Sequence, residues 1–219
     1  MIKNIIFDFD GVLVDSEILI AKAFAKYMQN FDIHIDEKEF ASFAGKKTVQ
    51  VIEILSKKYS IKDQQKFFTG IMDISSNIYK NELTTVKGAY DFVSNLKMNI
   101  FIGSNSMKKR IIEGLQGVKL NKYFQPEQVY SFDLVDKPKP DPDIYLKAIE
   151  DNSLNKNQTI IIEDSAVGVT AGVKAGIKVI GFTAGGHWFH HRSQQELLDA
   201  GASLIIDSYI DLSKKIIDL

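Results

Sequence analysis

Two acidic residues follow a short apolar run near the start of the chain, in the stretch IIFDFDGVLVDSE at positions 5–17. The apolar run indicates a buried strand, and an acid directly after such a strand must be hydrated, paired or bound to another group. Asp8 and Asp10 are two positions apart, so both lie on the same side of the strand end. Paired carboxylates in this arrangement could bind a metal ion, attack an electrophile or transfer a proton.

Further polar residues follow two later apolar runs. Ser104 ends the run MNIFIGS, and Glu163 and Asp164 end the run TIIIED. Ligands of an open parallel sheet bind beyond the carboxyl ends of its strands, so we expect these residues to meet the first two acids in one crevice. Four carboxylates there would repel one another unless a cation lay among them.

The ligand set favours magnesium as that cation. Carboxylate oxygens are hard ligands, and the chain offers no cysteine and no fixed histidine pair that would select zinc or copper. Magnesium in proteins usually acts on phosphate, where it bridges carboxylates to a phosphoryl oxygen. We therefore expect Mg²⁺ as the cofactor and a small phosphorylated molecule as the substrate.

Residues suited to the phosphoryl oxygens are also present. Lys139 lies in KPKPDPDIY, positions 137–145. Three prolines there stiffen an extended loop and restrict the conformational freedom of the lysine. Ser104 can donate its hydroxyl to the same group, and backbone amides of the turn that Asn105 begins lie beside it. We expect Ser104, Asn105 and Lys139 to bind the substrate phosphate.

Short β-rich runs alternate with helical patterns along most of the chain. The runs occupy residues 3–10, 98–104, 128–132, 159–164, 178–183 and 203–207. Such alternation is typical of βαβ units and hence of a parallel sheet with helices on both faces. The sequence therefore predicts an α/β fold with a three-layer, Rossmann-like parallel sheet.

Residues 16–85 break this alternation. They contain helical patterns, for instance at Ile20 and Phe24, and no convincing strand. We expect this stretch to form a small helical domain over the ends of the sheet, inserted after the first strand. The predicted domains are then residues 1–15 with 86–219, and residues 16–85.

Charge and composition limit the partners. The chain has 219 residues, with 27 Lys and Arg against 28 Asp and Glu. It therefore has no excess of positive charge that would attract nucleic acid or an anionic membrane. We find no signal-peptide core and no apolar run as long as a membrane span. The absence of cysteine suits a reducing compartment. These features predict a cytoplasmic protein with a small-molecule partner, and a monomer.

Taken together, the motifs resemble those of haloacid dehalogenase superfamily hydrolases, in the branch of β-phosphoglucomutase and small sugar-phosphate phosphatases. DFDGVLVDS resembles the first motif of that family, Ser104 the second and EDSAVG the fourth. The third motif is a lysine in KPxPD followed by an aromatic residue. Lys139 fits it better than Lys137, because only Lys139 places Tyr145 at the expected offset.

The resemblance implies a role for each residue. Asp8 would be the nucleophile that forms an aspartyl phosphate, and Asp10 would be the general acid and base. Asp8, the Asp10 position and Asp164 would hold Mg²⁺. Glu163 would join them directly or through water, or would instead pair with Lys139. The helical insertion would be the cap of the family.

Three functions fit these residues. The first is a phosphatase acting on a sugar phosphate or a phosphosugar acid. The second is a phosphomutase like β-phosphoglucomutase, whose cap helix carries a histidine where this sequence has Ile20, which weakens that interpretation. The third is a receiver-like phospho-acceptor, which would lack the cap. Dehalogenation is disfavoured because it would leave Asp10 and the acidic pair without a task.

Further candidate site residues lie outside these motifs. Lys46 and Lys47, in the predicted cap, are candidates for contact with an anionic substrate or are ordinary surface lysines. His187 follows two glycines in GGHW and is a candidate for substrate contact. Asp15 or Ser16 is expected to cap the helix that follows the first motif.

Overall fold

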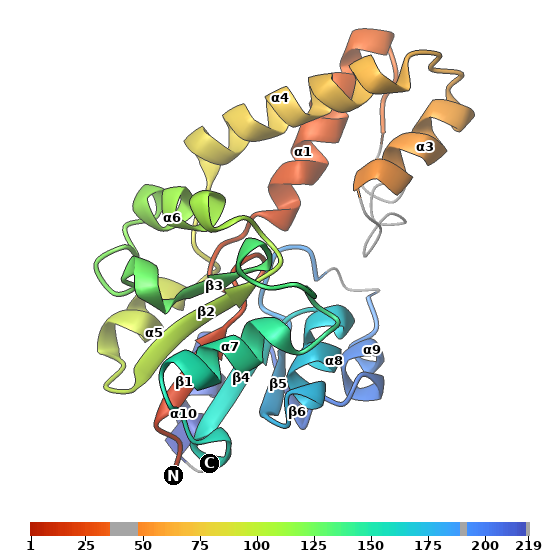
Figure 1. The fold of residues 1–219 in the computed structure, drawn as a ribbon. Coiled ribbons are helices and arrows are strands. Elements are labelled where there is room, and N and C mark those ends of the chain that lie inside the picture. The colour runs from red at the N-terminus through yellow and green to blue at the C-terminus, as the bar shows by residue number, and fades with distance from the viewer. Residues whose placement is uncertain (36–47, 189–191, 218–219) are drawn as a thin grey trace. The chain divides into compact units, whose positions relative to one another are not determined.

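The chain folds into two units in the computed structural model, which describes residues 1–35, 48–188 and 192–217. The core unit comprises Met1–Asp15 and Thr84–Leu219, and the helical unit comprises Ser16–Leu83. Figure 1 shows the order of the elements along the chain. The residues that carry the proposed chemistry belong to the core unit.

A six-stranded parallel sheet forms the centre of the core unit. Its strands are β1 (Asn4–Phe7), β2 (Asn99–Ser104), β3 (Val129–Ser131), β4 (Thr159–Glu163), β5 (Lys178–Phe182) and β6 (Leu204–Ile206). They lie in the order β3-β2-β1-β4-β5-β6, with β1 and β4 at the centre. Each strand falls within one of the six predicted runs, and the predicted α/β fold is confirmed.

The register of the sheet brings the acidic residues to one edge. Phe7 at the end of β1 is opposite Ile102 of β2 and Ile162 of β4. The amide of Asp8 still donates to the carbonyl of Ile162, at 2.9 Å. Asp8 and Glu163 therefore leave the sheet at the same level, as expected for parallel strands in register.

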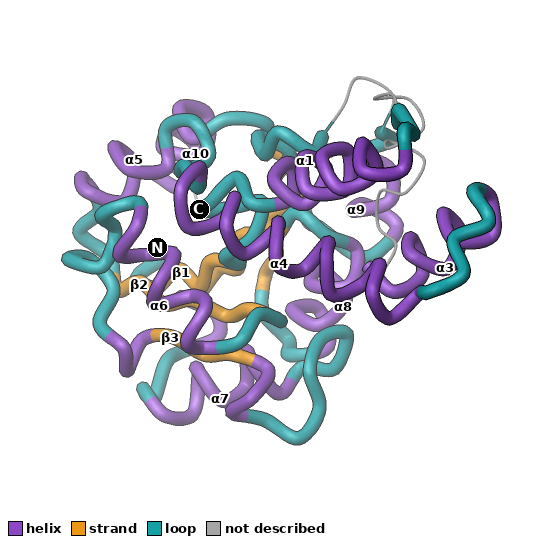
Figure 2. The backbone as a smooth tube through the Cα atoms, turned by 90° about the horizontal axis from the view of Figure 1, so that it is seen from above, coloured by secondary structure: helices purple, strands orange, loops and turns teal. Residues whose placement is uncertain are grey.

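Helices cover both faces of the sheet. The helices of the core unit are α5 (Ala89–Asn95), α6 (Lys108–Gly117), α7 (Asp143–Asp151), α8 (Ala166–Lys174), α9 (Gln195–Asp199) and α10 (Tyr209–Ile217), with short 3-10 turns at Pro126–Gln128, Phe132–Leu134 and Lys156–Gln158. Figure 2 shows α5 and α10 on one side of the strands and α7 on the other. The three-layer arrangement buries the strands on both faces.

Successive residues of β1 pack into the hydrophobic core on opposite faces of the sheet. The ring of Phe7 packs edge-on against Phe92 of α5, with centroids 6.2 Å apart. Its neighbour Ile6 belongs instead to a buried cluster with Ile144 of α7 and Val169 of α8. Because side chains alternate along a strand, one apolar run can fill two layers of core.

The helical unit has a core of its own. Its helices are α1 (Glu17–Met28), a 3-10 turn (Gln29–Phe31), α3 (Thr48–Lys58) and α4 (Gln64–Glu82). Phe24 and Met28 of α1, Leu55 of α3, and Phe67 and Ile71 of α4 form one buried cluster. Within the described part of this unit, all regular structure is helical, as predicted for the insertion.

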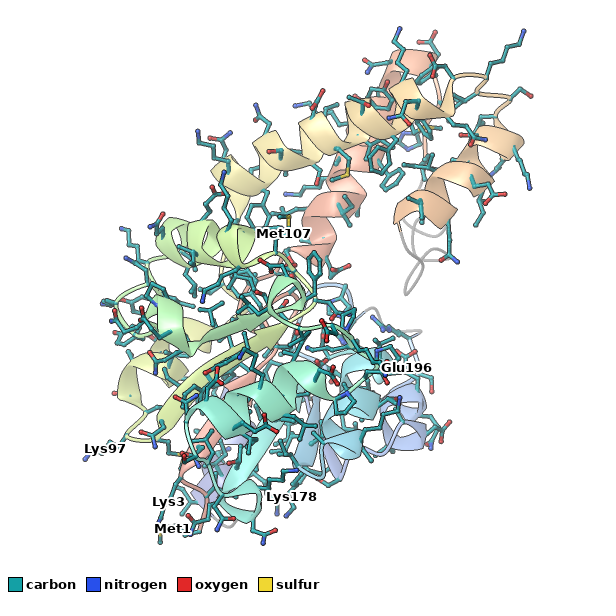
Figure 3. The ribbon with its side chains drawn as sticks, viewed as in Figure 1. Met1, Lys3, Lys97, Met107, Lys178 and Glu196 are labelled. Carbon is teal, nitrogen blue, oxygen red and sulfur yellow. The ribbon has the colours of Figure 1, made fainter. Side chains whose placement is uncertain are left out.

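Three strands of the sheet begin beside an exposed lysine. Lys3, Lys97 and Lys178, labelled in Figure 3, are exposed where β1, β2 and β5 begin. The acidic residues of the predicted site follow the opposite ends of the strands. In the described ranges, no helix combines the length and the apolar character needed to cross a bilayer.

Candidate active site

Three carboxylates gather beyond the carboxyl ends of β1 and β4. Asp8, Glu163 and Asp164 each offer an oxygen, and these oxygens all lie within 4.8 Å of one another. All three residues are buried. Burial, and then the charge of Glu163, raise the pKa values of Asp8 and Asp164 well above 3.8, although Lys139 opposes the shift. The oxygen-only donor set could hold a divalent metal ion, which would let these acids stay ionised together.

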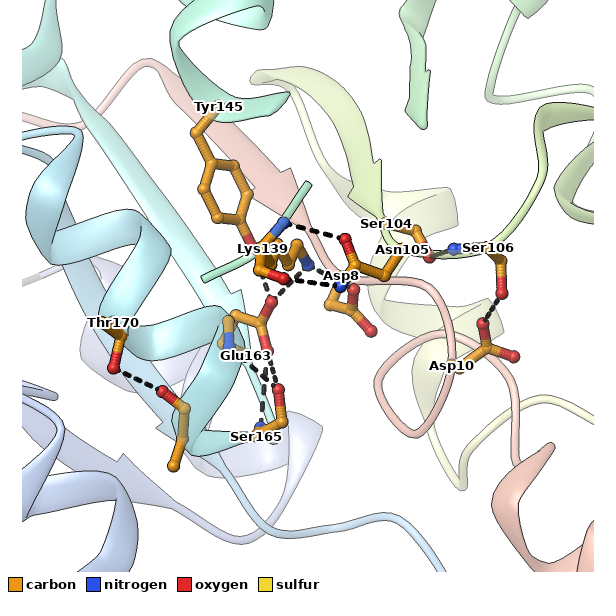
Figure 4. A network of polar contacts seen from close by, with 12 residues as sticks. Asp8, Asp10, Ser104, Asn105, Ser106, Lys139, Tyr145, Glu163, Ser165 and Thr170 are labelled. Carbon is orange, nitrogen blue, oxygen red and sulfur yellow. Dashed lines mark hydrogen bonds and ion pairs between the residues drawn. The ribbon is translucent and has the colours of Figure 1, made fainter. Parts of the chain in front are cut away.

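Lys139 lies between two of these carboxylates (Figure 4). Its ammonium is 2.6 Å from Oδ1 of Asp8 and also pairs with Oε1 of Glu163. Burial lowers the pKa of Lys139, but the charges of Asp8 and Glu163 outweigh this effect and raise it above 10.5. Lys139 therefore stays charged in the site, whereas Lys137 is exposed.

Asn105 holds the backbone of Lys139. The Asn105 side chain accepts a hydrogen bond from the Lys139 amide at 3.0 Å and donates one to the Lys139 carbonyl at 3.1 Å. The carboxamide thus fixes the loop that carries the lysine. The predicted phosphate contact of Asn105 remains a prediction.

Glu163 is enclosed by hydrogen-bond donors. The hydroxyl of Tyr145 donates to Oε1 at 2.6 Å, and the hydroxyl of Ser165 donates to Oε2 at 3.1 Å. A Cβ atom at Gly168 would lie 1.8–2.1 Å from the carboxylate, so only glycine leaves room for it. With Lys139 bound as well, Glu163 is engaged on both oxygens, which favours a supporting role over direct metal contact.

Asp164 has a different partner. Its Oδ2 lies 2.9 Å from Nε2 of His187, in the loop after β5. Gly11, with φ of +77°, passes close to this pair, and a Cβ there would lie 2.0 Å from Oδ2 of Asp164. A glycine is therefore required for both conformation and space at this turn.

Asp10 lies apart from the three-carboxylate cluster. Its Oδ2 accepts a hydrogen bond from the hydroxyl of Ser106 at 2.5 Å, and its Oδ1 pairs with Arg110 at 3.2 Å. The amide of Ser106 also donates to the hydroxyl oxygen of Ser104, at 3.0 Å. The turn after β2 thus contacts Asp10 and orients Ser104 at the same time.

The structure brings most of the predicted site residues together. One group of neighbouring residues comprises Asp8, Asn105, Lys139, Glu163, Asp164 and His187. Asp10 and Ser104 are linked to each other through Ser106. Lys46 and Lys47 lie outside the described residues. Ser106 and Arg110 were missed by the sequence reasoning. Ser106 is part of the SNS stretch that holds Ser104, and Arg110 is four residues later, at the start of α6.

The chain is similar in sequence to known phosphatases. The chain is 27% identical over 188 residues to the 6-phosphogluconate phosphatase of Escherichia coli (strain K12), an alignment that covers 85% of each chain. It is 28% identical over 182 residues to a phosphorylated carbohydrates phosphatase of Thermotoga maritima, with 81% of this chain and 83% of the relative covered.

A solved structure is similar over nearly the whole chain. A haloacid dehalogenase family hydrolase from Deinococcus radiodurans R1, solved with bound phosphate and sodium, superposes with a TM-score of 0.87 at 26% identity. The match covers 99% of this chain and 96% of that one. A sequence model of haloacid dehalogenase-like hydrolases also matches residues 5–182, which contain all four motifs. The chain belongs to the haloacid dehalogenase-like hydrolase family.

Proposed function

We propose that this protein is a Mg²⁺-dependent phosphatase that releases inorganic phosphate from a sugar phosphate or a phosphosugar acid. The observation that carries the proposal is the different surroundings of Asp8 and Asp10. Asp8 is paired with Lys139 beside two further carboxylates, whereas Asp10 is bound by Ser106 and Arg110. Two carboxylates with separate partners are suited to separate tasks.

Asp8 serves as the nucleophile in this proposal. Its carboxylate attacks the phosphorus, the bond to the substrate alcohol breaks, and an aspartyl phosphate forms on Asp8. Lys139 and the hydroxyl of Ser104 bind the phosphoryl oxygens. Mg²⁺, held by Asp8 and Asp164, would neutralise charge on the carboxylates and the phosphoryl group.

Asp10 serves as the acid and then as the base. It donates a proton to the departing alkoxide, and in the second step takes a proton from the water that attacks the phosphorus. The bond between phosphorus and Asp8 then breaks and releases phosphate. Ser106 and Arg110 keep the Asp10 carboxylate oriented between the two steps.

The substrate class is supported by the relatives. Two of them are named for 6-phosphogluconate and for phosphorylated carbohydrates, and each aligns with more than four fifths of this chain. The motifs contact only the phosphoryl group and the metal, so they suit any small phosphomonoester. We assign phosphosugars and phosphosugar acids as the class to test first.

The proposal is tested by phosphate release from a panel of phosphosugars, phosphosugar acids, phosphoglycolate and nucleoside monophosphates. We expect release with Mg²⁺, none with EDTA, and none from Asp8→Asn, because an amide is a poor nucleophile. Release by the Asp8→Asn variant would contradict the mechanism. Isomerisation of β-glucose 1-phosphate without phosphate release would show that the protein is a mutase and not a phosphatase.

A further inference from the structure

The loop after β5 returns to the carboxylate cluster and is held at two points. The amide of Gly186 donates to Oδ1 of Asp15 at 2.9 Å. The next residue, His187, places Nε2 2.9 Å from Oδ2 of Asp164. Only 12% of the His187 side chain and 8% of the Asp164 side chain are exposed. The contact between His187 and Asp164 is thus buried.

Glycines make room for the imidazole. A Cβ at Gly11 would lie 2.7 Å from Cε1 of His187, and a Cβ at Gly185 would lie 2.8 Å from its ring. A Cβ at Gly186 would also lie 2.7 Å from the Asp15 carboxylate. The ring therefore fills a space that larger residues would occupy, and its orientation toward Asp164 is fixed by packing on several sides.

We propose that His187 is a positioning residue for Asp164, a role that rests on the proposed Mg²⁺-dependent function. The contact engages Oδ2 of Asp164 and fixes the orientation of the carboxylate that would hold the metal. Partners of this kind orient metal-binding carboxylates and strengthen metal binding. His187 thereby acts on the metal through Asp164 rather than by touching the substrate. Asp15 supports it by holding the loop at Gly186.

The test compares two replacements of similar shape, of which only one can donate a hydrogen bond. Mg²⁺ alone is titrated into each folded variant by calorimetry. We expect His187→Met to weaken Mg²⁺ binding about 10- to 100-fold, and His187→Gln, whose amide replaces Nε2, to stay within about threefold of wild type. The exposed His34, replaced by Met, is the matched control. Unchanged Mg²⁺ binding in His187→Met, or equal loss in both variants, would overturn the proposal.

A second readout measures the wild-type protein and needs a variant only to identify signals. Mg²⁺ is added while the imidazole nitrogen resonances are followed by NMR, with the His187 signals identified by their absence in His187→Gln. We expect the His187 signals to shift and those of His34 to stay in place. Static His187 signals at saturating Mg²⁺ would overturn the proposal.

The positioning role of His187 and the proposed phosphatase function can fail independently of each other. If wild type binds Mg²⁺ and His187→Met does not, the positioning role stands even when no phosphate is released from any substrate. If wild type releases phosphate with Mg²⁺ and His187→Met binds Mg²⁺ normally, the positioning role fails and the phosphatase stands. At saturating Mg²⁺ the KM of His187→Met for p-nitrophenyl phosphate should equal that of wild type, since the residue does not touch substrate.

Discussion

The ammonium of Lys139 lies 2.6 Å from Oδ1 of Asp8, and only 3% and 10% of the two side chains are exposed. The lysine carries its charge into a place where three carboxylates converge. Because the pair is buried, water does little to weaken it, and loss of either partner leaves an uncompensated charge. The relationship links the stability of the core unit to its proposed chemistry.

Replacing Lys139 by methionine should therefore affect both properties. We expect the free energy of unfolding in EDTA to fall by about 3–5 kcal/mol. Phosphate release should fall by about 10²- to 10³-fold, since a group that stabilises the transferred phosphoryl is lost. Urea unfolding and steady-state kinetics give the two numbers. Lys137→Met, at an exposed position two residues earlier, is the control and should behave as wild type.

Magnesium should stabilise the protein more as the pH rises. The raised pKa values of Asp8 and Asp164 mean that above 3.8 the folded protein holds protons that the unfolded chain has released. The contribution of these acids to stability therefore falls with rising pH through that window. Mg²⁺ binds the ionised forms, so the difference in melting temperature between Mg²⁺ and EDTA should grow from about pH 4 to about pH 8.

Two features distinguish the titration of Asp8 and Asp164 from that of other groups. Lys139 also has a raised pKa, so its contribution to stability changes in the same direction, but it is lost only as the pH rises above 10.5. In Asp164→Asn the growth of the Mg²⁺ effect with pH should be smaller, because one titrating ligand is gone. A difference that stays constant from pH 4 to pH 8 would contradict this account of the cluster.

Gly168→Ala should destabilise the core unit, because the added Cβ would lie 1.8–2.1 Å from the Glu163 carboxylate. We expect a loss of about 1–3 kcal/mol, typical of overpacking. Gly117→Ala is the matched control: nothing lies within 4 Å of its Cβ, so that variant should equal or exceed wild type. Thermal unfolding compares the two. Equal stability of the two variants would show that Glu163 can move aside.

Ser106→Ala should slow turnover without weakening metal binding. It removes the hydroxyl that donates to Asp10 at 2.5 Å, so the proposed acid and base loses its orientation. We expect kcat to fall by about 10-fold, a part of the about 10²- to 10⁴-fold that general acid–base catalysis supplies. Ser94→Ala, whose hydroxyl donates to the carbonyl of Asp91, is the control. A change in Mg²⁺ affinity with unchanged kcat would contradict the assignment.

The sequence predicts the sheet and the order of its motifs because both depend on local signals. Apolar runs mark the strands, and parallel strands deliver the residues that follow them to one edge. Asp8, Ser104 and Glu163 could therefore be placed near one another. Lys139 lies on an irregular loop, and its selection over Lys137 came from the resemblance to a known motif.

Contacts between distant loops could not be predicted. Ser16 occupies the N-cap position of α1, as one of the two expected candidates, but its side chain makes no capping hydrogen bond, and Asp15 accepts from Gly186 instead. The carboxylate can satisfy either partner, and nothing local tells them apart. Arg110 was missed for the same reason, since its contact with Asp10 joins segments 100 residues apart.

The central claim is that Asp8 becomes phosphorylated during turnover. The most direct measurement is the mass of the peptide that contains Asp8, after acid quenching of the wild-type enzyme turning over a phosphosugar with Mg²⁺. The account predicts a fraction of this peptide with one added phosphoryl group, and none in Asp8→Asn. Rapid phosphate release with no phosphorylated peptide, or with the phosphoryl group on another residue, would contradict it.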